Sequence, residues 1–460
     1  MPFDWGSATV GDFVDLQRGN TYQSALLDTP GPVLLGLASI ERDGGFRSDK
    51  LRTYGGESPA KLLVYPGDMY VSLKDVTQSG DLLGSVARVP SFIAVGRMTQ
   101  DTVKLVFKNG LIDRSYLYWV LRTPEYREYC RARGMGTTNL SLSRDDFLSF
   151  PVPEPTSARL SIQRTLDAIE SKITLNRDIA QTLEAMAQAI FRSWFVDFDP
   201  VIAKITAIQA GRDPLRAAMT AISGKSDAEL DALPPEQYEQ LAATAALFPD
   251  EMEESELGEI PRGWAAATLA TVCELNASSW SARTLPTSVR YVDLANTKNG
   301  EVIDVQPMEG SNIPSRARRI LEAGDTIIGT VRPGNRSFAL VGEPGLTGST
   351  GFAVLRPKKS YLREYVYLAA TSDANIERLG HLADGGAYPA VRPELVVSDV
   401  LAIPQDDLLR EFHRISSDMF DQIVAMRRAN QNLADLRDTL LPKLLSGELP
   451  VANALLEAEA

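Results

Sequence analysis

The chain has 460 residues, of which 44% are apolar and 23% are charged, and its formal net charge is −13. These values are typical of a globular protein with more than one domain. The sequence contains no run of 18 apolar residues and no charged-then-apolar amino terminus, which excludes a membrane-spanning or exported chain. We therefore expect a soluble protein of the cytoplasm.

Cysteine and histidine are too scarce for a zinc site. Cys130 and Cys273 lie in different halves of the chain, and His381 and His413 are the two histidines. Zinc needs several such ligands at short spacings, so the sequence excludes a zinc site. Two cysteines in different halves of the chain also suit a reducing cytoplasm.

Residues 1–151 predict an α+β domain with a β core. Short β-branched and aromatic runs alternate with Gly, Pro and Asp, as in short strands joined by turns. One such run follows Gly67-Asp68, and residues 115–131 have a helical pattern.

Residues 152–198 predict one long helix. Apolar or small residues recur at alternating steps of four and three from Ile162 to Trp194. This 3.5-residue period is typical of the seam of a left-handed coiled coil. A helix of about 40 residues is roughly 60 Å long at 1.5 Å per residue, and its apolar stripe needs a partner. The main seam residues of this helix are Ile162, Leu166, Ile169, Ile173, Leu183 and Ile190.

Residues 199–260 predict an acidic connector that is partly helical. Between positions 201 and 260 the chain has twelve Asp or Glu and four Lys or Arg, so this stretch carries −8 of the total charge. The segment has no counterpart after the second long helix. The acidity of the chain therefore belongs largely to the connector and not to the domains on either side.

The rest of the chain repeats the first part about 250 residues later. Residues 261–402 resemble the first domain, with Gly324-Asp325 in the place of the first Gly-Asp pair and a helical pattern at 361–380. Residues 403–449 repeat the long helix, and 450–460 form a tail. The second seam is in register with the first after a shift of 250, and its main residues are Met419, Ile423, Leu433 and Leu440.

This repeat predicts the architecture. We expect two tandem β-rich domains separated by two long helices, which pair as an antiparallel coiled coil with an internal pseudo-two-fold repeat. A coiled coil that joins two copies of the chain is the alternative. Asn176 and Asn430 are polar seam positions that either fix the register or are tolerated there.

Motifs for catalysis are missing from the sequence. Gly224-Lys225-Ser226 ends like a phosphate-binding loop, but Met219 stands where the first glycine is required. The glycine-rich run at 342–351 is not followed by a helical pattern, which argues against a dinucleotide site. The Pro234-Pro235 pair lies in the acidic connector, outside the Asn/Asp-Pro-Pro-aromatic context of an adenine methyltransferase. We therefore expect a non-catalytic chain without a cofactor or metal ion.

Basic and polar side chains are distributed as DNA binding requires. Arg pairs with guanine, Asn or Gln pairs with adenine, and Lys and further Arg neutralise phosphates. A solvated surface is the alternative for any single residue. Lys74 and the segment 332–336 each follow the strand after a Gly-Asp pair, so we expect them in corresponding loops. The candidates are Arg42, Arg47, Lys50, Arg52, Lys74, Gln78 and Arg97 in the first domain, and Arg316, Arg318, Arg319, Arg332, Asn335 and Arg336 in the second.

With these features the whole chain resembles the specificity subunit of a type I restriction-modification system. The resemblance rests on the order domain, helix, domain, helix, on the Gly-Asp pairs before a strand, and on an apolar residue and a proline before each long helix, at 152–153 and 403–404. It also rests on three phrases, which are AIFRSWFVDFDPV at 189–201, ALFPDEMEESELGEIPRGW at 246–264 and LRDTLLPKLLSGEL at 436–449. It implies two target-recognition domains, each of which reads one half of a split double-stranded DNA sequence, and two helices that space them.

The resemblance also implies partners. The helices would dock two copies of a methyltransferase (modification) subunit that holds S-adenosylmethionine, with or without a restriction and translocase subunit that uses ATP and Mg. It supplies no base-contact residues, so the candidates above rest on chemistry and loop position. A coiled-coil scaffold with paired protein-binding domains and an enzyme with an unrecognised active site are the alternative functions.

Overall fold

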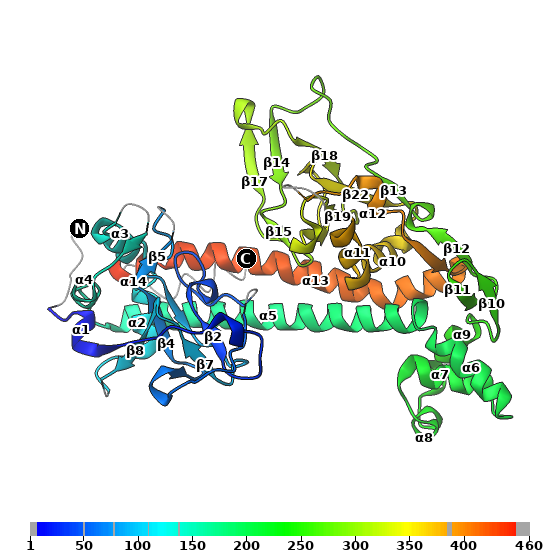
Figure 1. Ribbon diagram of the computed structural model, residues 1–460, viewed down its shortest axis with the longest axis horizontal. Helices are drawn as coiled ribbons and strands as arrows, with labels where there is room; N and C mark the ends of the chain where they lie inside the picture. The colour runs from blue at the N-terminus through cyan, green and yellow to red at the C-terminus, as the bar shows by residue number, and fades with distance from the viewer. Residues whose placement is uncertain are drawn as a thin grey trace. The chain divides into compact units, whose positions relative to one another are not determined.

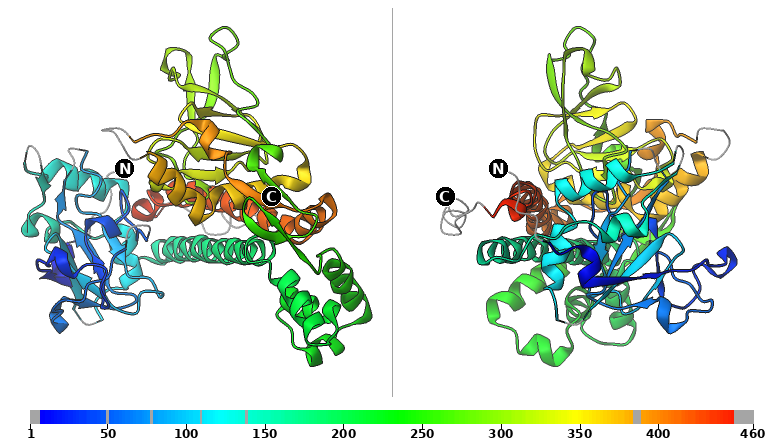
Figure 2. Two further views of the ribbon diagram at one scale, coloured as in Figure 1. Left: turned by 45° about the vertical axis from the view of Figure 1, so that its right-hand side comes forward. Right: turned by 90° about the vertical axis from the view of Figure 1, so that its left-hand side faces the viewer.

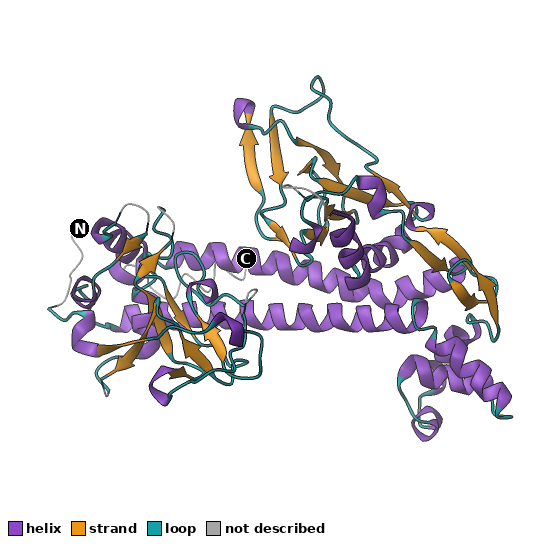
Figure 3. Ribbon diagram, in the orientation of Figure 1, coloured by secondary structure: helices purple, strands orange, loops and turns teal. Residues whose placement is uncertain are grey.

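The computed structural model describes residues 7–48, 51–76, 79–108, 110–136, 139–383 and 389–447. The chain divides into two compact units. Unit 1 comprises Met1–Leu175 together with Asn430–Ala460, and unit 2 comprises Asn176–Ala429. Each unit holds one of the two β-rich domains, which we call heads, and a part of each of two long helices. Each unit therefore mixes helices with strands (Figures 1 and 3).

The first head, in unit 1, is built on a four-stranded antiparallel sheet with the order β1-β8-β4-β6 (blue and cyan in Figure 1). A second sheet has the order β2-β7-β3, with β2 and β7 parallel. Gly67, at a φ of 83°, makes the tight turn before β4 that a residue with a side chain would strain. The strands are β1 (Val14–Arg18), β2 (Val33–Leu35), β3 (Leu63–Val64), β4 (Met69–Ser72), β5 (Lys74–Asp75), β6 (Val86–Arg88), β7 (Gly96–Met98), β8 (Thr102–Phe107) and β9 (Leu140–Ser141).

The predicted helix over 115–131 is two helices, α2 and α3. Pro124 disfavours helical geometry in the residue before it, and Thr123 is accordingly extended and caps α3. Asp113 caps α2 in the same way, by accepting a hydrogen bond from the amide of Tyr116. The helices of this head are α1 (Val10–Phe13), α2 (Arg114–Val120), α3 (Pro124–Arg133) and α4 (Arg144–Leu148).

The second head, in unit 2, repeats this topology. Its sheet β13-β22-β19-β20 matches β1-β8-β4-β6 strand for strand, and β14-β21-β18 matches β2-β7-β3, including the parallel first pair. The predicted internal repeat is therefore present in the strand order. These strands are β13 (Cys273–Leu275), β14 (Ser288–Val292), β17 (Gln306–Glu309), β18 (Ala317–Leu321), β19 (Thr326–Gly329), β20 (Phe338–Leu340), β21 (Leu346–Ser349) and β22 (Phe352–Pro357). Shorter pairs are β10 (Met252–Ser255) with β11 (Gly258–Pro261), β12 (Ala265–Thr268) with β23 (Val400–Ile403), and β15 (Thr297–Lys298) with β16 (Glu301–Val302).

One predicted helix of unit 2 differs from the sequence pattern, whereas the connector is partly helical as predicted. The predicted helix at 361–380 is broken at Ser372, which is extended, so a new helix begins at Asp373. The connector contains four helices (green in Figure 2) with a small apolar core around Met219 and Leu230. The helices are α6 (Asp199–Gln209), α7 (Pro214–Ser223), α8 (Asp227–Asp231), α9 (Pro235–Ala246), α10 (Arg363–Thr371), α11 (Asp373–Ala383) and α12 (Pro393–Val396).

The long helices are α5 (Ser157–Phe195) and α13 (Asp406–Leu440), and α13 is followed by the short α14 (Lys443–Ser446). In unit 1 the side-chain amide of Asn430 donates to the carbonyl of Ile173 at 3.4 Å, and Arg159 donates to the carbonyl of Leu445 at 2.6 Å. The chain directions of the two helices are therefore opposite in this unit.

Unit 2 shows the same direction. Glu184 of α5 pairs with Arg427 of α13 at 3.2 Å, and the rings of Phe191 and Phe412 lie 6.2 Å apart. As the residue number rises along α5, the number of the contacting residue on α13 falls. The predicted antiparallel contact is present within each unit, and the supercoil itself stays a prediction.

The residues of the predicted 3.5-residue seam lie on the buried side of both helices. All ten seam residues are buried or half-buried, whereas Leu175, which lies off the seam, is 51% exposed. Burial of an aliphatic side chain stabilises the fold by about 1.5–3 kcal/mol, so the seam is a major source of stability. The fully buried members are Ile162, Leu166, Ile169, Ile173, Ile423 and Leu440, and the half-buried members are Leu183, Ile190, Met419 and Leu433.

Candidate nucleic-acid interface

The Gly-Asp turns of the two heads have the same geometry. Asp68 accepts a hydrogen bond from the backbone amide of Tyr65 at 2.9 Å, and Asp325 accepts one from the amide of Glu322 at 2.9 Å. Such local bonds fix the turn and the direction in which the next strand starts. The central strands β4 and β19 therefore begin in the same way.

A basic residue of the neighbouring strand holds each turn. Lys104 of β8 lies 2.6 Å from Asp68, and Arg356 of β22 makes two hydrogen bonds to Asp325 at 2.9 and 2.8 Å. The bonds to Asp325 raise the pKa of the Arg356 guanidinium. Each turn is thus tied to the sheet that supports it.

The segments that follow β4 and β19 occupy corresponding places, but Lys74 lies in a short strand and not in the predicted loop. Lys74 lies in β5 and pairs with Ser141, just before α4. Val331 forms a bridge with Ala390, just before α12. In both heads the segment after the central strand is therefore paired with the segment before a short helix.

In the first head, three candidates are exposed, and each lies beside a carboxylate. These ion pairs are Arg42–Asp81, Arg52–Asp28 and Lys74–Asp101, at 3.9, 2.6 and 3.0 Å. A DNA phosphate has to compete with these carboxylates for the cation. Arg47 is half-buried, and Lys50 and Gln78 lie outside the described residues.

Arg97 is wrongly predicted as a DNA contact. Its side chain is 3% exposed, donates to the carbonyls of Glu57 and Thr21 at 3.3 and 2.9 Å, and lies 4.7 Å from the ring centre of Tyr54. It lies in β7, whose three residues are all buried. The Arg97 guanidinium therefore joins two segments inside the head by hydrogen bonds. Its burial could not be predicted from the fact that the residue is basic.

In the second head, three arginine candidates lie at or beside the edge strand β18. Arg316 is exposed and donates to the Tyr291 hydroxyl at 3.0 Å. Arg318 and Arg319 are half-buried at a register shift of the strand, and burial lowers the pKa of the Arg319 guanidinium. Arg318 Nη1 and Arg319 Nε are buried without an acceptor among the described residues, so an anion or water would satisfy them.

The loop between β19 and β20 holds the other candidates of this head. Arg332 and Asn335 are exposed; Arg332 precedes the 3-10 turn Pro333–Asn335, and Asn335 is the last residue of that turn. Arg336 is partly exposed, pairs with Asp373 at 2.7 Å and lies 5.4 Å from the ring centre of Phe338. The structure therefore brings the candidates Arg332, Asn335 and Arg336 together on one loop.

Sequence reasoning did not single out Asp373 or Phe338. Ser372-Asp373 is a helix-start signal inside the helical pattern at 361–380, and it could have located Asp373. No sequence signal places Phe338 against Arg336, because that contact depends on the turn of the loop.

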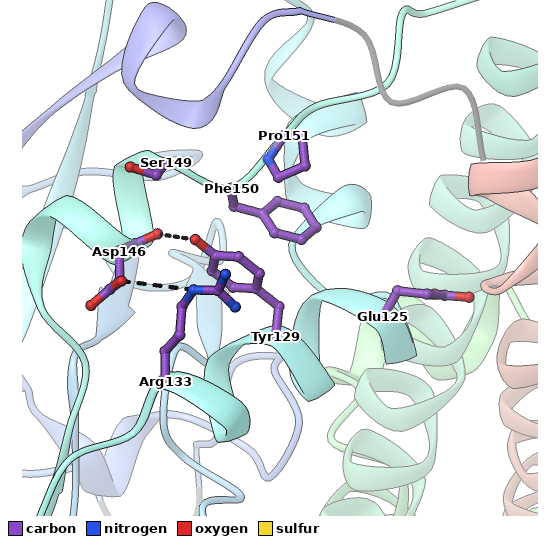
Figure 4. Close-up of a pocket in the computed structure, with 7 residues that line it drawn as sticks. All are labelled: Glu125, Tyr129, Arg133, Asp146, Ser149, Phe150 and Pro151. Carbon is purple, nitrogen blue, oxygen red and sulfur yellow. Dashed lines mark hydrogen bonds and ion pairs between the residues drawn. The ribbon is translucent and has the colours of Figure 1, made fainter. Parts of the chain in front are cut away.

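Unit 1 also has a surface pocket of about 510 Å³ between α3 and the segment after α4. Figure 4 shows Arg133 stacked on Tyr129 with Asp146 beside both, whereas Glu125 points away from these three. Tyr129 donates to the Asp146 carbonyl at 2.7 Å. Tyr129, Arg133 and Asp146 thus contact one another, whereas Oε2 of Glu125 is buried without a partner among the described residues.

The described residues contain no group of His, Cys, Asp or Glu placed to hold a metal ion, and no described helix is both long and apolar enough to cross a membrane. Cys130 and Cys273 are free and buried.

No protein-family model matches the chain. The type I restriction enzyme HindI specificity subunit of Haemophilus influenzae is 30% identical over 371 residues, which cover 74% of this chain and 78% of that protein. This chain belongs to the family of type I restriction enzyme specificity subunits. The MjaIX specificity subunit of Methanocaldococcus jannaschii is 19% identical over an alignment of 481 positions, which covers 98% of this chain and 95% of that subunit.

A solved member has the same fold. The crystal structure of a type I restriction-modification S subunit from M. genitalium matches with a TM-score of 0.51 and 13% identity, over 96% of both chains. The predicted resemblance to specificity subunits and the α+β fold are confirmed. Specificity subunits are the non-catalytic members of such systems, so the prediction that this chain is not itself an enzyme is also confirmed.

Proposed function

We propose that this specificity subunit reads a split double-stranded DNA sequence, with one half-site for each head. It directs a partner adenine methyltransferase, with or without a restriction endonuclease, to that sequence. Family membership supports the DNA-reading role, and two heads of one topology support the division into half-sites.

The observation that carries the proposal is the pair of basic segments that follow β4 and β19, with Lys74 in the first head and Arg332 to Arg336 in the second. Arg336 offers the fork that guanine O6 and N7 accept, Asn335 suits adenine, and Lys74 suits a phosphate. The tip of the second loop is open, because a Cβ atom built on Gly334 would meet no other atom within 4 Å. A DNA edge could therefore approach this loop closely.

We propose that α5 and α13 set the distance between the half-sites. The helices contact each other antiparallel in each unit, and their seam is buried. Half-sites one DNA turn apart have centres separated by about 34 Å. A pair of packed helices is a stiff spacer for such a distance, since each residue adds about 1.5 Å.

The same helices supply two docking sites for two methyltransferase copies. Leu175 and Leu436 are exposed in unit 1, and Ala425 and Met186 are exposed in unit 2. Positions 175 and 425 are related by the 250-residue repeat, as are positions 186 and 436. The two units thus present equivalent off-seam positions, which suits two copies of one partner helix.

Cofactors then belong to the partners. The methyltransferase would hold S-adenosylmethionine, and a restriction subunit would use ATP and Mg. The complex would act in the cytoplasm, where the host DNA lies.

Selection of bound sites from a randomised DNA pool tests the proposal. The chain is reconstituted with its methyltransferase, and bound fragments are sequenced. We expect two short specific blocks separated by an unread spacer of fixed length. One uninterrupted block, or no enriched block from an assembled complex, would contradict the split-site proposal.

Two further measurements separate the alternative functions. Retention on DNA that falls with salt when the methyltransferase is present would reject a purely protein-binding scaffold. Purified chain, labelled S-adenosylmethionine and unmodified host DNA should give no labelled DNA. Label above the level without protein would indicate an enzyme with an unrecognised active site.

A further inference from the structure

The guanidinium of Arg336 is held by two side chains of unit 2. Its Nη1 lies 2.7 Å from Oδ1 of Asp373, and its central carbon lies 5.4 Å from the ring centre of Phe338. The carboxylate restrains one edge of the planar group and the ring restrains one face. Together they limit the rotation of a side chain that is otherwise long and flexible.

The backbone beneath Arg336 is held in an uncommon conformation. Arg332 and Arg336 have φ values of 47° and 58°, in the left-handed region that residues with a side chain rarely adopt. Hydrogen bonds compensate this strain, since Arg336 donates its amide to the Pro333 carbonyl and accepts at its own carbonyl from Asn299. Strain that the surroundings hold in place is a feature of ligand-binding loops.

A fork of donors remains on Arg336. Asp373 forms its ion pair at Nη1, and Nε and Nη2 donate no hydrogen bond to another described residue. These two N–H groups form one edge of the guanidinium, which is the edge that a guanine can accept. The side chain is 38% exposed, so it is accessible from solvent.

The ion pair itself contributes little to the stability of the fold. Asp373 is 78% exposed, and exposed pairs contribute little to folding stability. A carboxylate on a DNA-binding surface also repels phosphates, which opposes binding to DNA of any sequence. An acid in the first turn of α11 is favourable for the helix, and at this position it also contacts the Arg336 guanidinium.

We infer that Asp373 is a positioning residue for sequence reading in the second half-site. It fixes the Arg336 guanidinium so that the Nε–Nη2 edge meets one base pair. This inference rests on the proposed function. The Asp373 carboxylate lowers the affinity for DNA of any sequence, because it repels phosphates. It raises discrimination at that base pair, because the Arg336 guanidinium is already ordered before DNA binds.

The test uses the full chain assembled with its methyltransferase and the site found by selection. Asp373→Asn removes the charge at nearly constant shape, and Arg336→Ala identifies the base pair that Arg336 reads. Glu377→Gln is the matched control, because it removes the same charge from the same helix one turn away. Asp373→Glu restores the charge, and each complex is assayed on the selected site and on single-base variants.

Asp373→Asn should reduce discrimination by roughly 2- to 10-fold at the base pair that Arg336→Ala relaxes, and at no other. Asp373→Glu should return most of the preference, which would not happen if the first variant had merely unfolded the head. Glu377→Gln should discriminate like the wild type.

Three results would overturn the inference. Asp373→Asn could keep full discrimination, or it could bind every sequence more tightly by one factor, which would show that Asp373 only repels phosphate. Arg336→Ala could weaken all sequences alike, which would make Arg336 a phosphate contact. A wild-type complex that selects no sequence would instead overturn the proposed function, and the inference with it.

Discussion

Asp325 and Arg356 form a two-point ion pair within the second head, at 2.8 and 2.9 Å, and the Asp325 side chain is only 1% exposed. Asp68 and Lys104 take the same places in the first head, joined by one contact at 2.6 Å. The repeat has therefore kept the charges while the geometry of the pair has changed. Both pairs anchor the turn that starts the strand leading to a candidate DNA-reading loop.

Replacing Asp325 with Ala should destabilise the second head by about 3 kcal/mol. Removing one partner leaves the Arg356 cation partly buried without its main acceptor. Denaturant unfolding followed by circular dichroism measures the change. Glu322→Ala is the control, because Glu322 contacts the same arginine from an exposed position, and it should cost less than about 1 kcal/mol. Equal losses for the two variants would show that the buried pair has no special role.

A charge in the helix seam should be far more harmful than a charge beside it. Ile173→Asp places a carboxylate at a buried seam position and should cost a few kcal/mol. Leu183→Asp should cost less, since Leu183 is half-buried. Leu175→Asp lies two residues from Ile173 on the exposed side and should leave the unfolding free energy nearly unchanged. Similar melting of the 173 and 175 variants would disprove the seam.

Stability should fall in alkaline solution. Burial raises the pKa of the Cys130 thiol to about 11 and that of Cys273 to about 12, against about 8.5 for a free cysteine. Above about pH 8.5 the unfolded chain loses thiol protons that the folded chain keeps, so the folded state is disfavoured as pH rises toward 11. Below pH 8 these groups contribute no pH dependence.

Unfolding free energies measured from pH 7 to pH 10.5 check this expectation, together with labelling by a thiol reagent at pH 8. The native chain should react slowly, and the unfolded chain should expose two thiols. Rapid native labelling, or a flat stability profile up to pH 10.5, would show that the thiols are not protected.

Deleting one heptad from each long helix should alter the DNA spacer. Removal of 176–182 and 426–432, which correspond in the repeat, shortens each helix by about 10 Å. The preferred spacer should become about three base pairs shorter, at 3.4 Å per base pair, or binding should be lost because the heads no longer face both half-sites. Full affinity of the deletion variant for the unchanged site would contradict the spacer role.

The sequence was most informative where a period or a repeat is long. The seam from Ile162 to Trp194 predicted one face of α5, because steps of four and three over more than 30 residues have no other simple explanation. The Gly-Asp pairs predicted matching strands, since the glycine must adopt a turn that other residues avoid.

Single side chains were predicted less well. Arg97 is basic and lies near other basic residues, but the parallel pairing of β7 with β2 buries it. The contact of Arg336 with Asp373 joins two elements 37 positions apart through a loop with left-handed residues, and no local pattern encodes that contact. Tertiary packing decides which charged side chains face solvent. Periodicity in the sequence predicts only which side of a helix or strand is buried as a whole.

The most direct test of independent reading by the two heads is selection of bound DNA with a variant of one head only. Arg332, Asn335 and Arg336 are replaced together by Ala, and the assembled complex is compared with the wild type on the same randomised pool. We expect the second half-site to lose preference at one or more base pairs, at about 1–3 kcal/mol each, and the first half-site to stay unchanged. An altered first half-site, or an unchanged sequence and affinity for both, would contradict reading of the second half-site by this loop.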